Sequence, residues 1–360
     1  MNKLNSIIAV ALLAVTFTSC KKDEEPIIVV PPSDGSTLTL NGIIGAEAGS
    51  SAGNSVYVDF SKDKANSVDR DSWDLGFYTG ADFKVIINAS NGASAILTTV
   101  AKTDLASVTF ADFDPNLLKI GQGGGVLTAT ATTPVTIDDP REASVLNKTV
   151  IATISATDSD NKVYIVNRKG GTNNVLANDE LYKIRILRKG TGYTLQYAKI
   201  SETVFNSLDV AKNSVTNFQY VSLVKRSTVV VEPEKADWDI VWGYSMYYTG
   251  TLPYGFSDLV FINNLAGVSA APITVTATKT YASFTEADLS TVTFDSKRDV
   301  IGSNWRITSG TPLGIKTDLF YVVKDGSGNV YKLKFVSMGV GSDGGERGRP
   351  VIEYKLIKKG

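Results

Sequence analysis

Hydrophobic and polar residues alternate over most of the chain from residue 38 onward. Val, Ile, Thr, Tyr and Phe gather in short runs, and Gly, Asn, Asp and Ser separate one run from the next. Alternation with a period of two is typical of β-strands that bury one face. The pattern therefore predicts an all-β fold of antiparallel strands.

A short aromatic phrase occurs twice, at residues 71–78 and 236–244. In each copy Trp is followed by Asp, an aliphatic residue, one variable residue and a large aromatic residue. With a period of two, the second copy places Trp238, Ile240 and Trp242 on one face of a strand, and we expect the first copy to do the same.

Further strand patterns accompany each copy of the phrase, and they occur in the same order in both parts of the chain. The corresponding runs are 56–60 and 218–223, 83–88 and 259–263, and the closing strands 181–197 and 330–356. Shared patterns in shared order predict a tandem duplication, with 37–200 as the first β domain and 201–360 as the second. The alternative is one large β-sandwich whose internal similarity is incidental.

Some segments between the strands carry other signals. Residues 102–113 and 281–294 have helix-like spacing. Residues 325–329 lie between two strand patterns and lack the closing glutamate of a calcium loop, so we predict a hairpin turn there and likewise at 158–161. The glycine-rich run 121–125 lacks the lysine of a phosphate-binding loop, which favours a flexible loop.

The N-terminus has the layout of a bacterial export signal. Residues 1–19 carry Lys3 and then an apolar core, and this core is shorter than the roughly 20 residues that span a bilayer. Cys20, the single cysteine of the chain, follows a lipobox-like Phe-Thr-Ser sequence. We therefore predict a signal peptide at 1–19 and a lipid anchor on Cys20. The alternative is a simple secreted protein.

Residues 20–36 are charged and proline-bearing, a composition that favours a flexible tether. Lysine followed by acidic residues directly after Cys20 resembles the signal that sends some lipoproteins to the outer face of the outer membrane. We predict a lipid-anchored protein of the outer membrane that faces the cell surface. The alternative is a generic spacer.

Composition and charge exclude several functions. The 36 basic and 37 acidic residues leave a net charge of −1, without the basic excess of a nucleic-acid binder. Histidine is absent, which excludes a Ser–His–Asp triad and a histidine-ligated zinc site. Asp74 and Asp239 could form a carboxylate pair, but we expect each to accept local hydrogen bonds. The sequence thus predicts a protein that is not an enzyme and has no metal site.

The order of these landmarks resembles the HmuY family of haem-binding surface lipoproteins. The resemblance is carried by the opening aromatic strand, the Trp-Asp strand and the closing hairpin 321–335, and the second copy fits it better than the first. It implies an all-β fold for each domain. It also implies capture of haem or a related ligand at the cell surface and transfer to an outer-membrane receptor.

The family's founding member binds haem iron through two histidines, whereas this chain has Ser309 and Gly310 where the family pattern would carry one of them. Some relatives use methionine, a soft ligand suited to haem iron. Met246 lies in an aromatic stretch that could sandwich a flat ring, although such stretches also form cores. The candidate haem-binding residues are Tyr244, Met246, Tyr247, Tyr248, Trp305 and Met338.

Two other functions stay open at this point. A glycan- or protein-binding adhesion module could use Trp305 or Tyr247 and Tyr248 for stacking on a sugar face. Alternatively, the chain could be an accessory structural subunit that holds a partner at the surface.

Overall fold

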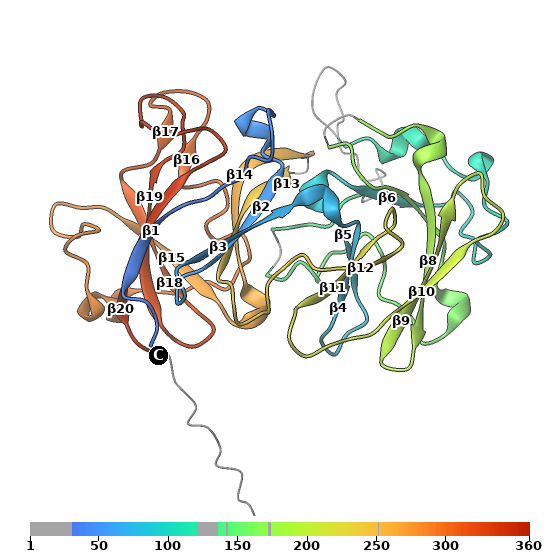
Figure 1. The fold of residues 1–360 in the computed structure, drawn as a ribbon, viewed down its shortest axis with the longest axis horizontal. Helices are drawn as coiled ribbons and strands as arrows, with labels where there is room; N and C mark the ends of the chain where they lie inside the picture. Colours follow the sequence, from blue (N-terminus) through green and yellow to red (C-terminus); the bar gives the residue numbers. More distant parts are fainter. Residues whose placement is uncertain (1–30, 121–135, 142, 172–173, 251) are drawn as a thin grey trace, which may run out of the picture. The chain divides into compact units, whose positions relative to one another are not determined.

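Regular structure in this protein consists almost entirely of β-strands, which confirms the predicted all-β fold (Figure 1). The computed structural model describes residues 31–120, 136–141, 143–171, 174–250 and 252–360. Cys20, the predicted signal peptide at 1–19 and the glycine-rich run 121–125 lie outside the described residues. Residues 32–360 group into one compact unit.

Two five-stranded antiparallel sheets have matching strand orders. The first, sheet I, runs β10 (Asn206–Val210), β9 (Gly192–Lys199), β8 (Tyr182–Lys189), β7 (Tyr164–Asn167) and β6 (Ser94–Leu97). The second, sheet II, runs β1 (Gly35–Thr39), β20 (Val351–Lys358), β19 (Val330–Ser337), β18 (Leu319–Lys324) and β15 (Ser269–Thr274). In Figure 1, the blue strand β1 lies beside the red strand β20.

Two four-stranded sheets also match. Sheet III runs β12 (Ser227–Val229), β11 (Phe218–Ser222), β4 (Leu75–Tyr78) and β5 (Val85–Ile87). Sheet IV runs β3 (Lys64–Asp69), β2 (Asn54–Asp59), β13 (Ile240–Thr249) and β14 (Leu252–Ile262). A small pair, β16 (Arg306–Ile307) and β17 (Gly314–Ile315), completes the sheets.

The opening hairpins are exchanged between the halves of the chain. The hairpin β2–β3 pairs with β13 of the second half, with Val58 opposite Ile240, whereas β11–β12 pairs with β4 of the first half, with Val221 opposite Leu75. In Figure 1, β2 and β3 lie beside β13 and β14 of the second half. Strand pairing thus crosses the predicted boundary at residue 200, and the domain limits stay a prediction.

Hydrogen bonds repeat at corresponding positions in the two halves. Asn88 Nδ2 donates to the carbonyl oxygen of Trp73 at 2.7 Å, and Asn263 Nδ2 donates to that of Trp238 at 3.0 Å. Each asparagine also donates to the carbonyl three residues before that tryptophan, at 2.7 and 2.9 Å. The repeated bonds and strand orders support the duplication, which remains a proposal.

The tryptophans of the repeated phrase do not share the predicted strand face. The strands begin only after the aspartates, at Leu75 and Ile240. Trp73 consequently packs in a different apolar cluster from Leu75, and Trp238 packs edge-on against Tyr57 at 5.1 Å. That part of the prediction was wrong because each strand begins only after the aspartate and does not include the tryptophan.

The two main cores lie under the five-stranded sheets. Sheet II packs on β2, β13 and β14 around Trp242, Tyr321 and Tyr331. Sheet I packs on β4, β5 and β11 around Phe77 and Tyr193. Because the exchanged hairpins supply residues to both cores, each core depends on both halves of the chain.

The two predicted helices are only short 3-10 turns within the described residues. β-Branched residues around them lower helix propensity. The turns are η4 (Phe110–Asp112) and η9 (Glu286–Thr291). The remaining ones are η1 (Gly49–Ser51), η2 (Arg70–Ser72), η3 (Ala89–Asn91), η5 (Pro115–Leu118), η6 (Asp158–Asp160), η7 (Asn178–Glu180) and η8 (Asn264–Ala266).

The predicted hairpin turn at 325–329 is confirmed. It joins β18 to β19, and Asp325 Oδ1 accepts the amide hydrogens of Ser327 at 2.9 Å and Asn329 at 2.8 Å. The carboxylate thus closes the turn itself. The second predicted hairpin, at 158–161, is instead a 3-10 turn before β7.

Candidate ligand-binding surface

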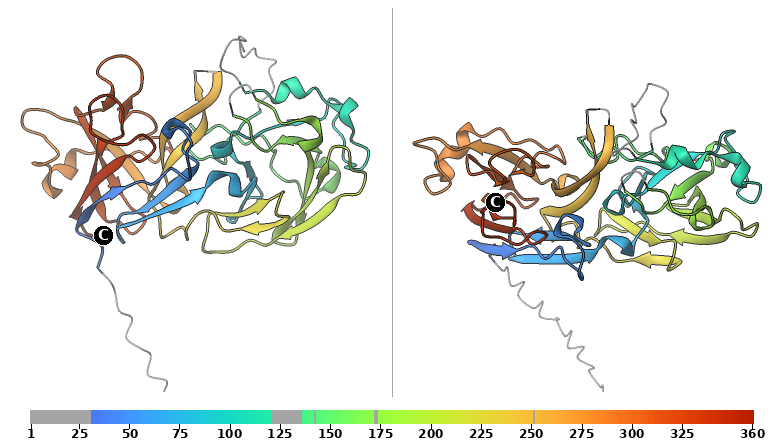
Figure 2. Two further views of the ribbon diagram at one scale, coloured as in Figure 1. Left: turned by 45° about the horizontal axis from the view of Figure 1, so that its top comes forward. Right: turned by 90° about the horizontal axis from the view of Figure 1, so that it is seen from above.

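The hairpin of β13 and β14 is the main structural difference between the two halves. Its strands contain 10 and 11 residues, whereas the corresponding strands β4 and β5 contain 4 and 3. Figure 2 shows the hairpin projecting beyond its sheet. Four of the six candidate haem-binding residues lie on β13, so the extra length carries most of the predicted site.

One face of the hairpin is closed. Met246 is 0% exposed and packs with Ile120 and Ile137, and the Tyr244 hydroxyl donates to its sulfur at 3.8 Å. A register shift between Gly243 and Ser245 separates Tyr244 from the core around Trp242. Met246 and Tyr244 therefore lie in contact, and the sulfur of Met246 is buried in a small apolar cluster.

Arginine side chains cover the aromatic rings on this closed face. The Arg70 guanidinium lies 4.5 Å from the centre of the Tyr244 ring, and that of Arg141 lies 4.7 Å from the centre of the Tyr248 ring. Such cation–π contacts fix both rings in place. The rings of Tyr244 and Tyr248 are therefore occupied by protein partners.

The opposite face of the hairpin carries three half-buried rings, which we call the aromatic strip: Tyr247, Tyr254 and Phe256. The centres of the Tyr254 and Phe256 rings are 4.1 Å apart with an angle of 34° between the planes. The Tyr247 ring meets Phe256 edge-on at 5.1 Å. Half-buried rings held by their neighbours present a rigid apolar surface for a flat ligand.

The hydroxyls of Tyr247 and Tyr248 are held in the neutral form. Tyr247 donates to Asp299 Oδ2 at 2.8 Å, and burial, then this bond to the carboxylate, raises its pKa well above the usual range. Burial, and then the charge of Asp139, raises the pKa of Tyr248 to about 12. Neither hydroxyl is a ready phenolate ligand for iron at neutral pH.

Two predicted site residues lie in the core around sheet II instead of on a surface. Met338 is 0% exposed, and Trp305 is 1% exposed and stacked on Phe335 at 4.0 Å. The Trp305 indole donates to the carbonyl of Asp258 at 3.1 Å. The structure thus separates Met338 and Trp305 from Met246 and assigns both of them packing contacts.

The two aspartates of the repeated phrase secure the exchanged hairpins. Asp74 Oδ2 accepts the amide hydrogen of Leu223 at 2.7 Å, and Asp239 Oδ2 accepts that of Phe60 at 2.8 Å. The donors lie 149 and 179 residues away in sequence. The prediction that these aspartates accept local hydrogen bonds was therefore wrong. Each carboxylate is committed to the backbone of the other half.

The sequence did not predict a further cavity that the structure contains. A cavity between sheets III and IV is lined by Arg298, Asp138 and Glu232 together with aromatic residues. No motif pointed to it, because each charged residue lies in an ordinary polar segment of the sequence. Among the described residues, no cluster of acidic side chains could hold a metal ion.

Comparison with known proteins agrees with the sequence resemblance. Residues 214–354 match the family model described as HmuY protein, so this part of the chain is HmuY-like. The family is one of surface-associated lipoproteins that bind ligands. No curated protein and no solved structure matches the chain. Within the described part of the chain, no helix is long and apolar enough to span a membrane.

Proposed function

We propose that this protein is a lipoprotein of the outer-membrane surface that captures a porphyrin-class ligand, haem included, on the aromatic strip. The HmuY-like character of residues 214–354 supports the ligand class. The aromatic strip is the observation that carries the proposal, because it offers apolar rings on a projecting hairpin. Transfer of the ligand to an outer-membrane receptor is part of the same proposal.

Binding in this proposal does not use iron ligation. The chain has no histidine, and the sulfurs of Met246 and Met338 belong to fully buried side chains. The Tyr247 hydroxyl is bonded to Asp299. The ligand is instead held by ring–ring contact and by removal of its apolar surface from water.

A haem titration of residues 21–360, followed by absorbance, tests the function. Tyr254→Ala combined with Phe256→Ala should weaken binding by about tenfold or more, because each ring contact contributes on the order of 1 kcal/mol. The matched control is Phe110→Ala, which removes a ring that is 40% exposed in the first half. Equal weakening by both variants would contradict the assignment to the strip, and a flat wild-type titration would contradict the function.

Methionine substitutions provide the complementary test. Met246→Leu with Met338→Leu keeps the buried volume and should leave the haem affinity unchanged within about twofold. Loss of a saturable absorbance shift in this variant would mean that sulfur ligates the iron.

Glycan binding is a second candidate. The half-buried rings of Tyr254 and Phe256 could also stack on the face of a sugar. Retention in polysaccharide affinity gels without a haem response would favour this function. Neither candidate requires catalysis, and we propose that the protein is not an enzyme.

The anchor gives a separate prediction. Cys20→Ser removes the thiol that carries the lipid, so the protein should move from the membrane fraction to the soluble fraction. One acyl chain binds a membrane only marginally, and stable attachment requires two or more. Fractionation of cells that express either form provides the measurement, and retention of the variant in the membrane fraction would contradict lipidation at Cys20.

A further inference from the structure

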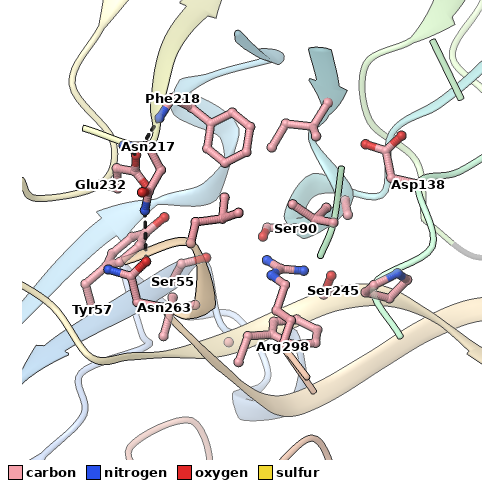
Figure 3. Close-up of a pocket in the computed structure, with 18 of the residues that line it drawn as sticks. Ser55, Tyr57, Ser90, Asp138, Asn217, Phe218, Glu232, Ser245, Asn263 and Arg298 are labelled. Atoms are coloured by element: carbon pink, nitrogen blue, oxygen red, sulfur yellow. Dashed lines mark hydrogen bonds between the residues drawn. The ribbon is translucent and has the colours of Figure 1, made fainter. Parts of the chain in front are cut away.

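The cavity between sheets III and IV lies where corresponding residues of the two halves meet; we call it the central cavity (Figure 3). On one wall Tyr57 packs edge-on against Trp238 at 5.1 Å, and on another Tyr220 packs against Trp73 at 4.7 Å. Asn217 Nδ2 donates to Asn263 Oδ1 at 2.9 Å. The cavity is therefore a built feature of the exchanged fold.

Arg298 is a half-buried cation that lines this cavity. Its guanidinium lies 4.1 Å from the centre of the Phe261 ring, and Figure 3 shows it among the lining residues near Ser90 and Ser245. In the described part of the chain, its side chain forms no hydrogen bond and no ion pair. Burial lowers the pKa of Arg298 below its usual range, as expected for a desolvated cation that lacks a partner.

A backbone hydrogen bond fixes the position of Arg298. The amide of Ile262, at the end of β14, donates to the Arg298 carbonyl at 2.9 Å. At the corresponding end of β5, the amide of Ile87 donates to Asp138 Oδ2 at 2.8 Å. The two halves thus place an arginine and an aspartate at matching positions of one cavity.

The carboxyl groups of the cavity already have other partners. Asp138 also accepts the amide hydrogen of Val150 at 2.8 Å. Glu232 Oε1 accepts the amide hydrogens of Asn217 at 2.7 Å and Phe218 at 2.8 Å. Burial raises the pKa of Asp138 and of Glu232 to about 7. Around neutral pH, each is therefore partly protonated and balances the arginine charge incompletely.

We propose that the central cavity binds a small carboxylate through the guanidinium of Arg298. A planar guanidinium matches a carboxylate with two parallel hydrogen bonds, and an unpaired buried charge is costly until a counter-charge arrives. The cavity volume is about 80 Å³, and a single water needs about 10–15 Å³. An acetate-sized ligand fits this space and a porphyrin does not, so the site is distinct from the aromatic strip.

Calorimetric titration with acetate and, separately, with inorganic phosphate tests the proposal on residues 21–360. Acetate should bind with one site per chain. Arg298→Met should weaken it by at least about tenfold, since a charge-assisted bidentate contact is lost. Lys225→Met, which removes an exposed cation in the turn after β11, should change the affinity by less than about twofold.

Several results would overturn the proposal. They are an absence of acetate binding to the wild type, equal affinity in the Arg298→Met variant, and binding of phosphate in place of acetate. If Arg298→Met does not fold by circular dichroism, the wild-type titration alone decides between support and rejection. Because these titrations contain no porphyrin, failure here leaves the function of the aromatic strip unaffected.

Discussion

Asp74→Ala should lower the free energy of unfolding by about 3–5 kcal/mol, the cost of removing one partner of a buried ion pair. Asp74 is 0% exposed, and its Oδ1 lies 2.8 Å from Nε of Arg168. Its other oxygen accepts the amide hydrogen of Leu223 from the exchanged hairpin. The substitution therefore leaves a buried cation and a buried N–H group without this acceptor. Urea-induced unfolding gives the measurement.

Asp71→Ala is the matched control. Asp71 also pairs with Arg168, but its side chain is 41% exposed, and exposed ion pairs contribute only about 0–1 kcal/mol. The same unfolding experiment should therefore separate the two variants clearly. Equal losses for Asp71→Ala and Asp74→Ala would contradict the view that Asp74 secures the exchanged hairpin.

The second large effect is a dependence of stability on pH. Burial raises the pKa of Glu232 from 4.5 to about 7 in the folded protein. The folded state then binds this proton more tightly than the unfolded chain does, so the stability contribution is fully present below pH 4.5 and is lost as the pH rises to about 7. For Glu232 alone, the loss between those values is about 3 kcal/mol.

Glu232→Gln isolates this contribution, because the amide oxygen can still accept the amide hydrogens of Asn217 and Phe218. Urea unfolding at pH 5 and at pH 8 should show that the variant loses less stability over this interval than the wild type. Asp138, whose pKa is also raised to about 7, should leave part of the dependence of stability on pH in the variant. An identical change in the free energy of unfolding between pH 5 and pH 8 in both proteins would show that Glu232 does not titrate in this range.

The strands could be predicted from the sequence, but their partners could not. Alternation identified β2, β11 and β13 within a few residues. The same pattern permits β2 to pair with β4 nearby or with β13 far away, because both present apolar residues with a period of two. The exchange is visible only in the structure, in the pairing of β2 with β13 and of β11 with β4 and in the distant amide hydrogens that Asp74 and Asp239 accept.

Of the proposed binding surface, the sequence identified only Tyr247, and the candidate haem-binding residues stay a prediction. The stretch around Met246 and Tyr247 lies on the long hairpin, but alternation could not tell which rings would share a face, because a bulge after Gly243 changes the faces. Trp305 and Met338 were chosen by residue type, and both side chains are buried in the hydrophobic core around sheet II. Arg298 was missed since its Ser-Lys-Arg-Asp context resembles any charged turn. Its burial arises from contacts between the two halves.

The most direct test of the proposed function is a pair of titrations of residues 21–360, one with haem and one with metal-free protoporphyrin IX. Capture by the aromatic strip without iron ligation predicts saturable binding of both, with Kd values within about fivefold of each other, since ring contacts are indifferent to the metal. Binding of haem alone would contradict this account, because it would require an iron ligand from the protein.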